Sequence, residues 1–395
     1  MTERQRLITK YIYKLSPATS VRYQLHFLRT ERDESARHML IDSLLQIQKD
    51  TNNSELQSVI NDVCKNSGAS IKFGKHNQKA DKIRKIKDED GSFPRGTNGK
   101  GKQDYSQDAH SHFSALELED ALKFYDRAIN HFRKTSSHVE KFYQNRAECN
   151  LCLENYKEAL SLAQKGRLFD MAFVSAISIG EMEEAKKYIP PIFRSIIDNN
   201  HNKESVASTF ELIHLILIVC FATYTTSETS KISSQLFSAV NFDLQNLKEL
   251  TDSFCNRKFD QFVSQFSILN TLLDISLYAS PSKATILQAI KQNVIINRIL
   301  PLAKTQIDVL KNELKFDLDE ITSLIRISIR NGRLNGKLDL VSKSYVGGII
   351  DTEHEEMKDA FARTMSIRQN FELNLWKEEY NALVPLHQGT AKKGK

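Results

Sequence analysis

The chain has 395 residues, a formal net charge of +6 and a pI near 8.8. That length allows about two or three domains with sizeable cores. The 14 glycines and 7 prolines make 21 together, whereas average usage of roughly 12% would give about 47. So few chain-breaking residues disfavour an all-β fold and a Gly-rich phosphate-binding loop. The composition therefore predicts a mostly helical, soluble protein.

The basic excess is concentrated in two segments. Residues 74–104 carry nine Lys or Arg against five Asp or Glu, and residues 386–395 add three lysines and no acid. The rest of the chain is left with a net charge of −1. We therefore expect a nearly neutral folded part without the basic footprint of a nucleic-acid-binding domain.

Cysteine usage and hydropathy indicate the cellular compartment of the protein. Five cysteines in 395 residues do not make a disulfide framework. The first ten residues are polar and charged rather than a signal peptide. The most apolar run, 212–222, is about half the roughly 20 residues needed to span a bilayer. We expect this run to be a buried helix, and the protein to lie in a reducing compartment, the cytoplasm, the nucleus or both, with no contact to membranes.

The first 114 residues divide into two parts by composition. Residues 1–73 are predicted to be an N-terminal helical block, because apolar residues recur there at helical spacing. They include Leu40, Leu44, Ile47, Leu56, Val59, Ile60 and Val63. Residues 74–114 hold five of the 14 glycines and few apolar residues. Burial cannot offset the ordering entropy there, so we predict a disordered basic insert.

Residues 115–200 are predicted to form TPR-like helical repeats. Three similar stretches each place an alanine in an amphipathic helix after a turn-like site, at Ala121, Ala159 and Ala185. Small residues at such positions let helices approach closely, as in arrays of helical hairpins. The intervals of 38 and 26 residues are unequal. A degenerate solenoid is therefore favoured, with an irregular helical domain as the alternative.

The region 201–350 is predicted to end in a winged helix at about 304–348. Residues 307–314 are typical of a short helix, and Asp317 with Glu320 of a capping box at the start of the next. That second helix ends at Asn331-Gly332, and two short extended pieces follow, at 334–340 and 345–346. Helix, helix and hairpin at this length are the plan of a winged helix.

Residues 351–384 are predicted to form one long amphipathic helix, and residues 385–395 a flexible basic tail. A T-x-x-E capping box precedes the helix. Its apolar stripe consists of Phe361, Met365, Leu373, Trp376, Tyr380 and Leu383. Such a helix can pack on its own domain or join a bundle with other chains. Its separation from the core by Gly347-Gly348 favours the bundle.

One motif is typical of metal chemistry. Metal-dependent isopeptidases pair a His-x-His with an Asp about ten residues later, because zinc needs three fixed protein ligands. Here His110 and His112 form the pair, but Lys123 stands at the eleventh position after it. The nearest acids, Glu119 and Asp120, come early and in an expected helix. We therefore expect no zinc chemistry at this motif.

No other motif predicts catalysis. Cys149 and Cys152 form a lone C-x-x-C on a predicted helix, without the second pair that structural zinc needs, so we expect buried thiols. Phosphate-loop, nucleophile-elbow, H-E-x-x-H and dinucleotide patterns are absent from the sequence. His131 and His214 are expected to be hydrogen-bonded helix residues. The prediction is a protein that is not an enzyme and has no cofactor or metal.

A winged helix raises nucleic-acid binding as an alternative. Its second helix would offer Arg326 and Arg330 to a groove, and its hairpin Arg333, Lys337 and Lys343. These are ordinary numbers for a solvated face. We therefore expect no DNA or RNA partner.

The order of repeat array, winged helix and terminal helix resembles that of PCI proteins, scaffold subunits of the proteasome lid, the COP9 signalosome and a translation initiation factor. Particular segments resemble the subunit-one family of the COP9 signalosome in its helical repeat, in the helix-turn-helix that enters its PCI domain and in its winged helix. They are, in that order, DALKFYDRA (120–128) with SHV (137–139) and LENY (153–156), LKELTDSFCNRKF (247–259), and LDEITSLIR (318–326) with GRLNGKLD (332–339). The resemblance covers about residues 116–365, with gaps.

This resemblance implies a non-catalytic scaffold. The assembled signalosome removes a ubiquitin-like modifier from cullins, using a zinc centre on another subunit, and so regulates SCF-type ubiquitin ligases. The implied partners are other PCI subunits, a zinc isopeptidase subunit and, through the complex, cullin-based ligases. The chain is short for this family, and its insert is unlike the family. This reduction suggests a diverged member, similar to the subunit-one counterpart of budding yeasts that is often called subunit eleven. The homologous proteasome-lid subunit is the sister alternative.

The resemblance also assigns two interaction surfaces. PCI subunits associate laterally through their winged-helix sheets, and an uncapped strand is a ready template for pairing. On this sequence the edge residues would be Leu338, Leu340, Tyr345 and Val346. Terminal helices of the family gather into one bundle, whose face here would be Phe361, Met365, Leu373, Trp376 and Tyr380.

Overall fold

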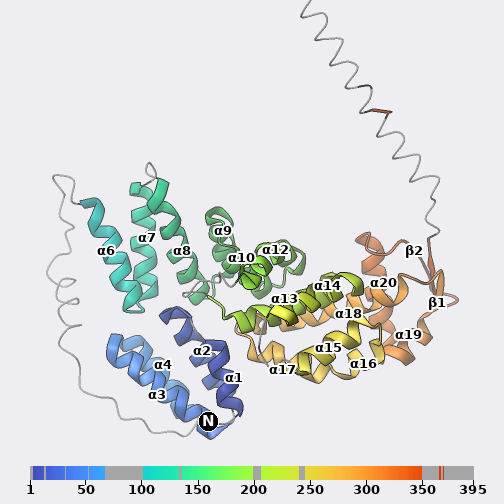
Figure 1. Ribbon diagram of the computed structural model, residues 1–395, viewed down its shortest axis with the longest axis horizontal. Coiled ribbons are helices and arrows are strands. Elements are labelled where there is room, and N and C mark those ends of the chain that lie inside the picture. Colours follow the sequence, from blue (N-terminus) through green and yellow to red (C-terminus); the bar gives the residue numbers. More distant parts are fainter. Residues whose placement is uncertain are drawn as a thin grey trace, which may run out of the picture. The chain divides into compact units, whose positions relative to one another are not determined.

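The protein is mainly helical (Figure 1). It divides into two compact units. The computed structural model describes residues 3–12, 15–31, 33–51, 53–66, 101–132, 136–198, 206–239 and 245–348, together with residues 364, 365 and 368. Unit one comprises residues 1–298 and 313–315, and unit two comprises residues 299–312 and 316–395. The boundary predicted at residue 200 thus falls inside unit one, whereas unit two begins close to the predicted start of the winged helix.

The predicted N-terminal helical block is confirmed over its described residues. It consists of α1 (Glu3–Ile12), α2 (Pro17–Thr30), α3 (Glu34–Thr51) and α4 (Ser54–Asn66). Helix α2 begins where Pro17 occupies its first turn and the Ser16 hydroxyl accepts the Thr19 N–H. The predicted core positions Leu40, Leu44, Leu56 and Ile60 are all buried.

The predicted disordered insert is wrong over its last 14 residues, which form helix α6 (Gly101–Ser114). Ala109 is fully buried, and Phe113 packs against the core that α6 shares with helix α7 (Leu118–Phe132). The segment has no clear periodicity, so packing on its neighbour, rather than its own pattern, accounts for the helix. Residues 74–100 lie outside the described residues.

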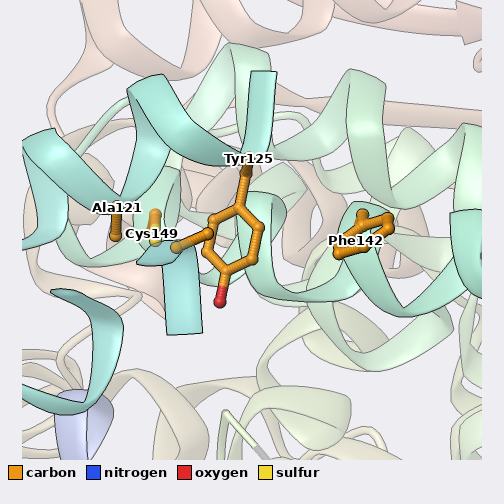
Figure 2. Close-up of a cluster of buried hydrophobic side chains, with 5 residues drawn as sticks. Ala121, Tyr125, Phe142 and Cys149 are labelled. Atoms are coloured by element: carbon orange, nitrogen blue, oxygen red, sulfur yellow. The ribbon is translucent and has the colours of Figure 1, made fainter. Parts of the chain in front are cut away.

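The predicted repeat region is a run of short helices. Helix α7 is followed by α8 (Ser136–Cys152), α9 (Tyr156–Gly166), α10 (Phe169–Ser178), α11 (Met182–Lys186) and α12 (Ile189–Ile197). The three alanines predicted at close helix approaches are fully buried. Figure 2 shows one of them, Ala121, beside Tyr125 of the same helix and Phe142 and Cys149 of α8. Small residues at these positions allow the close packing of an array.

Among the residues that the structure describes, six helix ends have the same tight connection. Each ends in a left-handed residue, and the N–H of the next residue donates to the carbonyl five positions earlier, which is a Schellman motif. The left-handed residues are Leu116, Glu154, Arg167, Gly180, Arg257 and Gly332. In all but the last case a new helix begins two residues later. Only two of the six are glycine, so most of these turns carry no glycine signal in the sequence.

The remainder of unit one is built around a fully buried helix, α13 (Thr209–Thr223), which confirms the prediction for residues 212–222. Around it come α14 (Thr226–Ala239), α15 (Gln245–Cys255), α16 (Phe259–Ser264), α17 (Phe266–Ile275), the short η1 (Ser280–Ser282) and α18 (Lys283–Ile299). Phe221 of α13 packs at ring-centroid distances of 5.2 Å against both Phe254 and Phe262. Across the described residues, every helix is too short or too polar to cross a membrane.

Unit two holds a small antiparallel sheet. The chain runs through β1 (Lys304–Gln306), α19 (Ile307–Leu314), α20 (Leu318–Arg330), β2 (Gly336–Asp339) and β3 (Ser344–Gly347). The sheet order is β1-β3-β2. The two helices and the hairpin lie where they were predicted, but β1 was not predicted. Asp317 is the N-cap of α20, although its side chain makes no capping hydrogen bond.

Candidate interaction surface

The sheet of unit two places the predicted edge residues differently from expectation. Strand β3 lies between β1 and β2, so the prediction that Tyr345 and Val346 belong to an edge is wrong. The three-residue β1 is too short to be recognised by its pattern, yet it occupies the side of β3 that the hairpin leaves open. Leu338 does lie on an edge strand, β2.

The register separates an inner from an outer row of side chains. Tyr345 pairs with Thr305 on one side and Leu338 on the other, and all three are buried or half-buried. The Tyr345 hydroxyl donates to the Asn335 carbonyl at 2.8 Å. Tyr345 is therefore a core residue of unit two.

The outer row combines charge with an apolar centre. Val346, which is 40% exposed, pairs with Lys304 of β1 and with Lys337 of β2, both exposed. Lysines on both edge strands oppose uncontrolled strand pairing. This face therefore favours a partner that offers carboxylates around a small apolar contact.

The tip of the hairpin is an ordered apolar point. Leu340 is 58% exposed and Val341 is 96% exposed. One carboxylate oxygen of Asp339 accepts the N–H groups of Val341 and Ser342, at 2.9 and 3.2 Å, and the other accepts the Ser342 hydroxyl at 2.6 Å. These hydrogen bonds lower the pKa of Asp339. They also fix the turn that presents the two apolar side chains to solvent.

Val341 was missed by sequence reasoning, although Leu340 was predicted. The signal that points to it is the breakdown of alternation in Leu338-Asp-Leu-Val341, where two apolar residues stand together at a turn.

The predicted bundle face is largely beyond the described residues. Met365 is 43% exposed and lies in a helical stretch. The other four positions, Phe361, Leu373, Trp376 and Tyr380, lie outside the described residues, so this surface stays a prediction.

His214 is hydrogen-bonded inside unit one, as predicted. Its Nδ1 lies 2.7 Å from the Tyr11 hydroxyl, and its ring lies 4.4 Å from that of Phe210. Burial lowers the pKa of His214 to about 3. The ring is therefore neutral at physiological pH and joins α1 to α13. The side chain of His131 lies outside the described residues.

The C-x-x-C thiols are interior groups. Cys149 is fully buried and Cys152 is half-buried. Burial raises the pKa of Cys149, and it raises the pKa of Cys152 to about 12. Since the thiolate is the reactive form, neither group has the character of a redox or nucleophilic cysteine.

A polar contact set that the sequence did not reveal joins the N-terminal block to the repeats. Arg22 of α2 donates to the Leu151 carbonyl and to the Tyr156 hydroxyl, and its guanidinium lies 5.4 Å from the Tyr156 ring centre. Glu148 of α8 accepts from the hydroxyls of Ser16 and Thr19. The N-terminal helices are thus held to α8 and α9 by specific hydrogen bonds.

The His-x-His pair is split by the structure. His110 is exposed, whereas His112 is buried and its Nδ1 lies 2.6 Å from Glu117 Oε2. Asp120, which was dismissed at the sequence level, lies with His112 and Glu117 in one group whose ligand atoms are all within 4.8 Å of one another. The third ligand of an isopeptidase site follows the histidine pair by about ten residues, whereas Glu117 and Asp120 follow His112 by five and eight.

Neither a scan against models of protein families nor a search of curated proteins gives a match to this chain.

Proposed function

We propose that this protein is a non-catalytic scaffold subunit of a COP9 signalosome, in which unit two is a winged helix that contacts a neighbouring subunit. The observation that carries the proposal is the run of tightly connected helices in unit one followed by the β-α-α-β-β order of unit two. In that order the sheet is closed by a first strand from before the two helices, which is the arrangement that a winged helix needs.

The segments of family resemblance support the proposal by the elements that they occupy. Residues 247–259 span most of α15, the left-handed Arg257 and the start of α16, which is a helix-turn-helix. Residues 318–326 lie on α20, and residues 332–339 form the turn and strand β2. The local structure of these two segments, a helix-turn-helix and a helix followed by a strand, supports the proposal.

The exposed residues of unit two suggest where a neighbouring subunit would bind. The hairpin tip of Leu340 and Val341 offers apolar area, and Lys304 and Lys337 flank the outer row. Apolar anchors surrounded by polar residues are typical of binding hot spots. We place the subunit in the cytoplasm and nucleus, where cullin-based ligases would be reached through the complex.

Affinity purification of the tagged chain from its own cells, followed by mass spectrometry, tests the proposal. Recovery of other PCI subunits, a zinc isopeptidase subunit and cullins is the expected result. Proteasome ATPases and core subunits would instead assign the chain to the proteasome lid, which is the homologous alternative.

A double substitution at the hairpin tip tests the surface within that experiment. Leu340→Asp with Val341→Asp adds two charges to the proposed contact, so recovery of at least one PCI subunit should fall about tenfold or more, as expected for a loss above 1.4 kcal/mol. Val309→Asp, at a position 49% exposed on α19, is the matched control and should leave recovery unchanged. Equal recovery with the tip variant would exclude the tip as a contact.

Nucleic-acid binding is the less favoured function of the same unit. The N-terminal turn of a recognition helix faces base edges, but the first turn of α20 carries Asp319 and Glu320. Arg326 and Arg330 are at the other end of that helix. Recovery of nucleic acid in place of PCI subunits, with binding that falls steeply as salt rises, would reverse this order of preference.

A further inference from the structure

We propose that His112, Glu117 and Asp120 form a binding site for one divalent transition-metal ion, of which Zn²⁺ is the best fit, at the junction of α6 and α7. The three side chains come from the last turn of α6, the connecting residue and the first turn of α7. Their ligand atoms lie within 4.8 Å of one another, and among the described residues they are the one group of three that does so.

The connection itself explains why these three residues meet. Leu116 takes a left-handed conformation, and the Glu117 N–H donates to the His112 carbonyl, so the chain turns from α6 into α7 within three residues. This turn places residue 112 beside residue 117, and the first turn of α7 brings residue 120 to the same point. The site is thus built by the backbone.

Comparison with the equivalent connections in the same chain shows that the triad is unusual. The position of His112 in the turn is taken elsewhere by Asn150, Ala163, Ala176, Ser253 and Ser328. An acid at the third position of the next helix does recur, at Glu158 and Glu184, where it accompanies no histidine. Helix capping therefore accounts for Asp120, but it does not account for an imidazole at the residue whose carbonyl accepts the hydrogen bond of the turn.

The imidazole is held in place before any ion binds. Its side chain is only 8% exposed, and its ring stacks on that of Phe124 at 4.9 Å with an interplanar angle of 10°. A fixed ring lowers the entropy cost of coordination. One imidazole nitrogen and two carboxylate oxygens are a ligand set that Zn²⁺ accepts, with water in the fourth position.

Existing contacts of both carboxylates must give way to the ion. Glu117 must exchange its hydrogen bond with His112 for the metal, and Lys123 Nζ must leave Asp120 Oδ1, which it approaches at 3.2 Å. Lys123 is 66% exposed, and surface ion pairs of this kind contribute little. Ligands about 2.0–2.1 Å from the ion lie about 3.3 Å apart in a tetrahedron. Glu117 must therefore move away from His112 Nδ1, which it approaches at 2.6 Å, and a pair at the 4.8 Å limit must move closer by about 1.5 Å.

Titration calorimetry of the purified, chelator-treated full chain with ZnCl₂ tests the site. The expected result is one Zn²⁺ bound per chain, with affinity reduced at least about tenfold by His112→Gln. His110→Gln is the matched control, because His110 is exposed two residues away and lies outside the triad. Equal loss with both variants, or equal affinity of His112→Gln and wild type, would overturn the proposal.

A second measurement covers the case in which His112→Gln disturbs folding. Co²⁺ substituted for Zn²⁺ reports its own geometry through its visible absorption, so the wild type should show a tetrahedral spectrum. Asp120→Asn should weaken or shift that spectrum while circular dichroism stays unchanged. An octahedral spectrum would contradict the tetrahedral site, and a spectrum that Asp120→Asn leaves unaltered would show that Asp120 is not a ligand.

Discussion

Glu211 makes the stability of the fold depend on pH. It is fully buried in α13, and one of its oxygens accepts the Ser276 hydroxyl at 2.8 Å. Burial raises the pKa of Glu211 from 4.5 to about 8. The folded state therefore holds a proton between these values that the unfolded state has lost, so the free energy of unfolding falls as pH rises through this window.

Glu211→Gln removes this dependence. Below pH 6.5 the buried His214 acts in the opposite sense, since its lowered pKa makes the fold lose stability as pH falls. The informative range is therefore pH 6.5 to 8, where the wild type should lose up to about 1.4 kcal/mol per pH unit and Glu211→Gln should change less. Urea unfolding followed by circular dichroism measures both. Identical slopes would mean that Glu211 is ionised inside the fold.

At the scale of single elements, left-handed residues at helix ends affect the stability of the fold. Arg167 has φ 54°, and its side chain is exposed. The left-handed conformation costs an L-residue roughly 1–2 kcal/mol, whereas glycine costs more entropy on folding. Arg167→Gly should therefore stabilise unit one by about 0.5–1 kcal/mol.

A nearby substitution provides the comparison for Arg167→Gly. Lys165 is equally exposed but lies within α9, so Lys165→Gly should destabilise by about 1 kcal/mol. Thermal unfolding distinguishes the two signs. A loss of stability in both variants would show that the turn at residue 167 is not strained.

Strand β2 depends on a glycine for a different reason. A Cβ at Gly336 would lie 2.4 Å from the Val346 carbonyl oxygen and 2.7 Å from the Tyr345 hydroxyl. Gly336→Ala should therefore separate β2 from β3 and cost about 1–3 kcal/mol. Hydrogen exchange of the β2 and β3 amides should rise, while that of α13 should stay unchanged.

Gly332 is the internal reference for this experiment. Its φ is +69°, but a Cβ there meets nothing within 4 Å. Gly332→Ala therefore introduces backbone strain without a collision, and the hairpin amides should stay protected. Similar exchange in both alanine variants would contradict the collision at Gly336.

Arg22 connects elements far apart in the sequence and so acts at the scale of unit one. Arg22→Met keeps much of the apolar stem but removes the donors to Leu151 and Tyr156. The loss should be about 1–3 kcal/mol, with faster hydrogen exchange in α1 and α2. Arg29→Met, at the exposed end of the same helix, should change neither quantity.

At the scale of the whole molecule, the sequence predicted the class of structure better than its boundaries and turns. Strong periodicity located α3, α19 and α20, and continuous hydrophobicity located α13. Helix α6 was missed because its order comes from packing around Ala109, which no local pattern records. Strand β1 was missed because three residues carry almost no periodic signal, and that omission produced the wrong edge for Tyr345.

The residues of the candidate sites also differ in whether a local sequence pattern predicts them. Leu340 was predicted from hydrophobicity, but Val341 and the grouping of His112 with Asp120 depend on the path of a turn. Turns at Glu154 or Arg167 use residues that are not typical of left-handed conformations. Contacts across such turns therefore follow from the three-dimensional structure alone.

The helices that meet at these left-handed turns are joined by only two or three residues. One residue added between Arg167 and Leu168 would disrupt the hydrogen bond from the Leu168 N–H to the Ala163 carbonyl, and it would change the direction in which α10 leaves α9. The buried face of α10 would then no longer meet its present neighbours. Among relatives of this chain, insertions and deletions should consequently be excluded from these junctions, even where the amino acids at them vary freely.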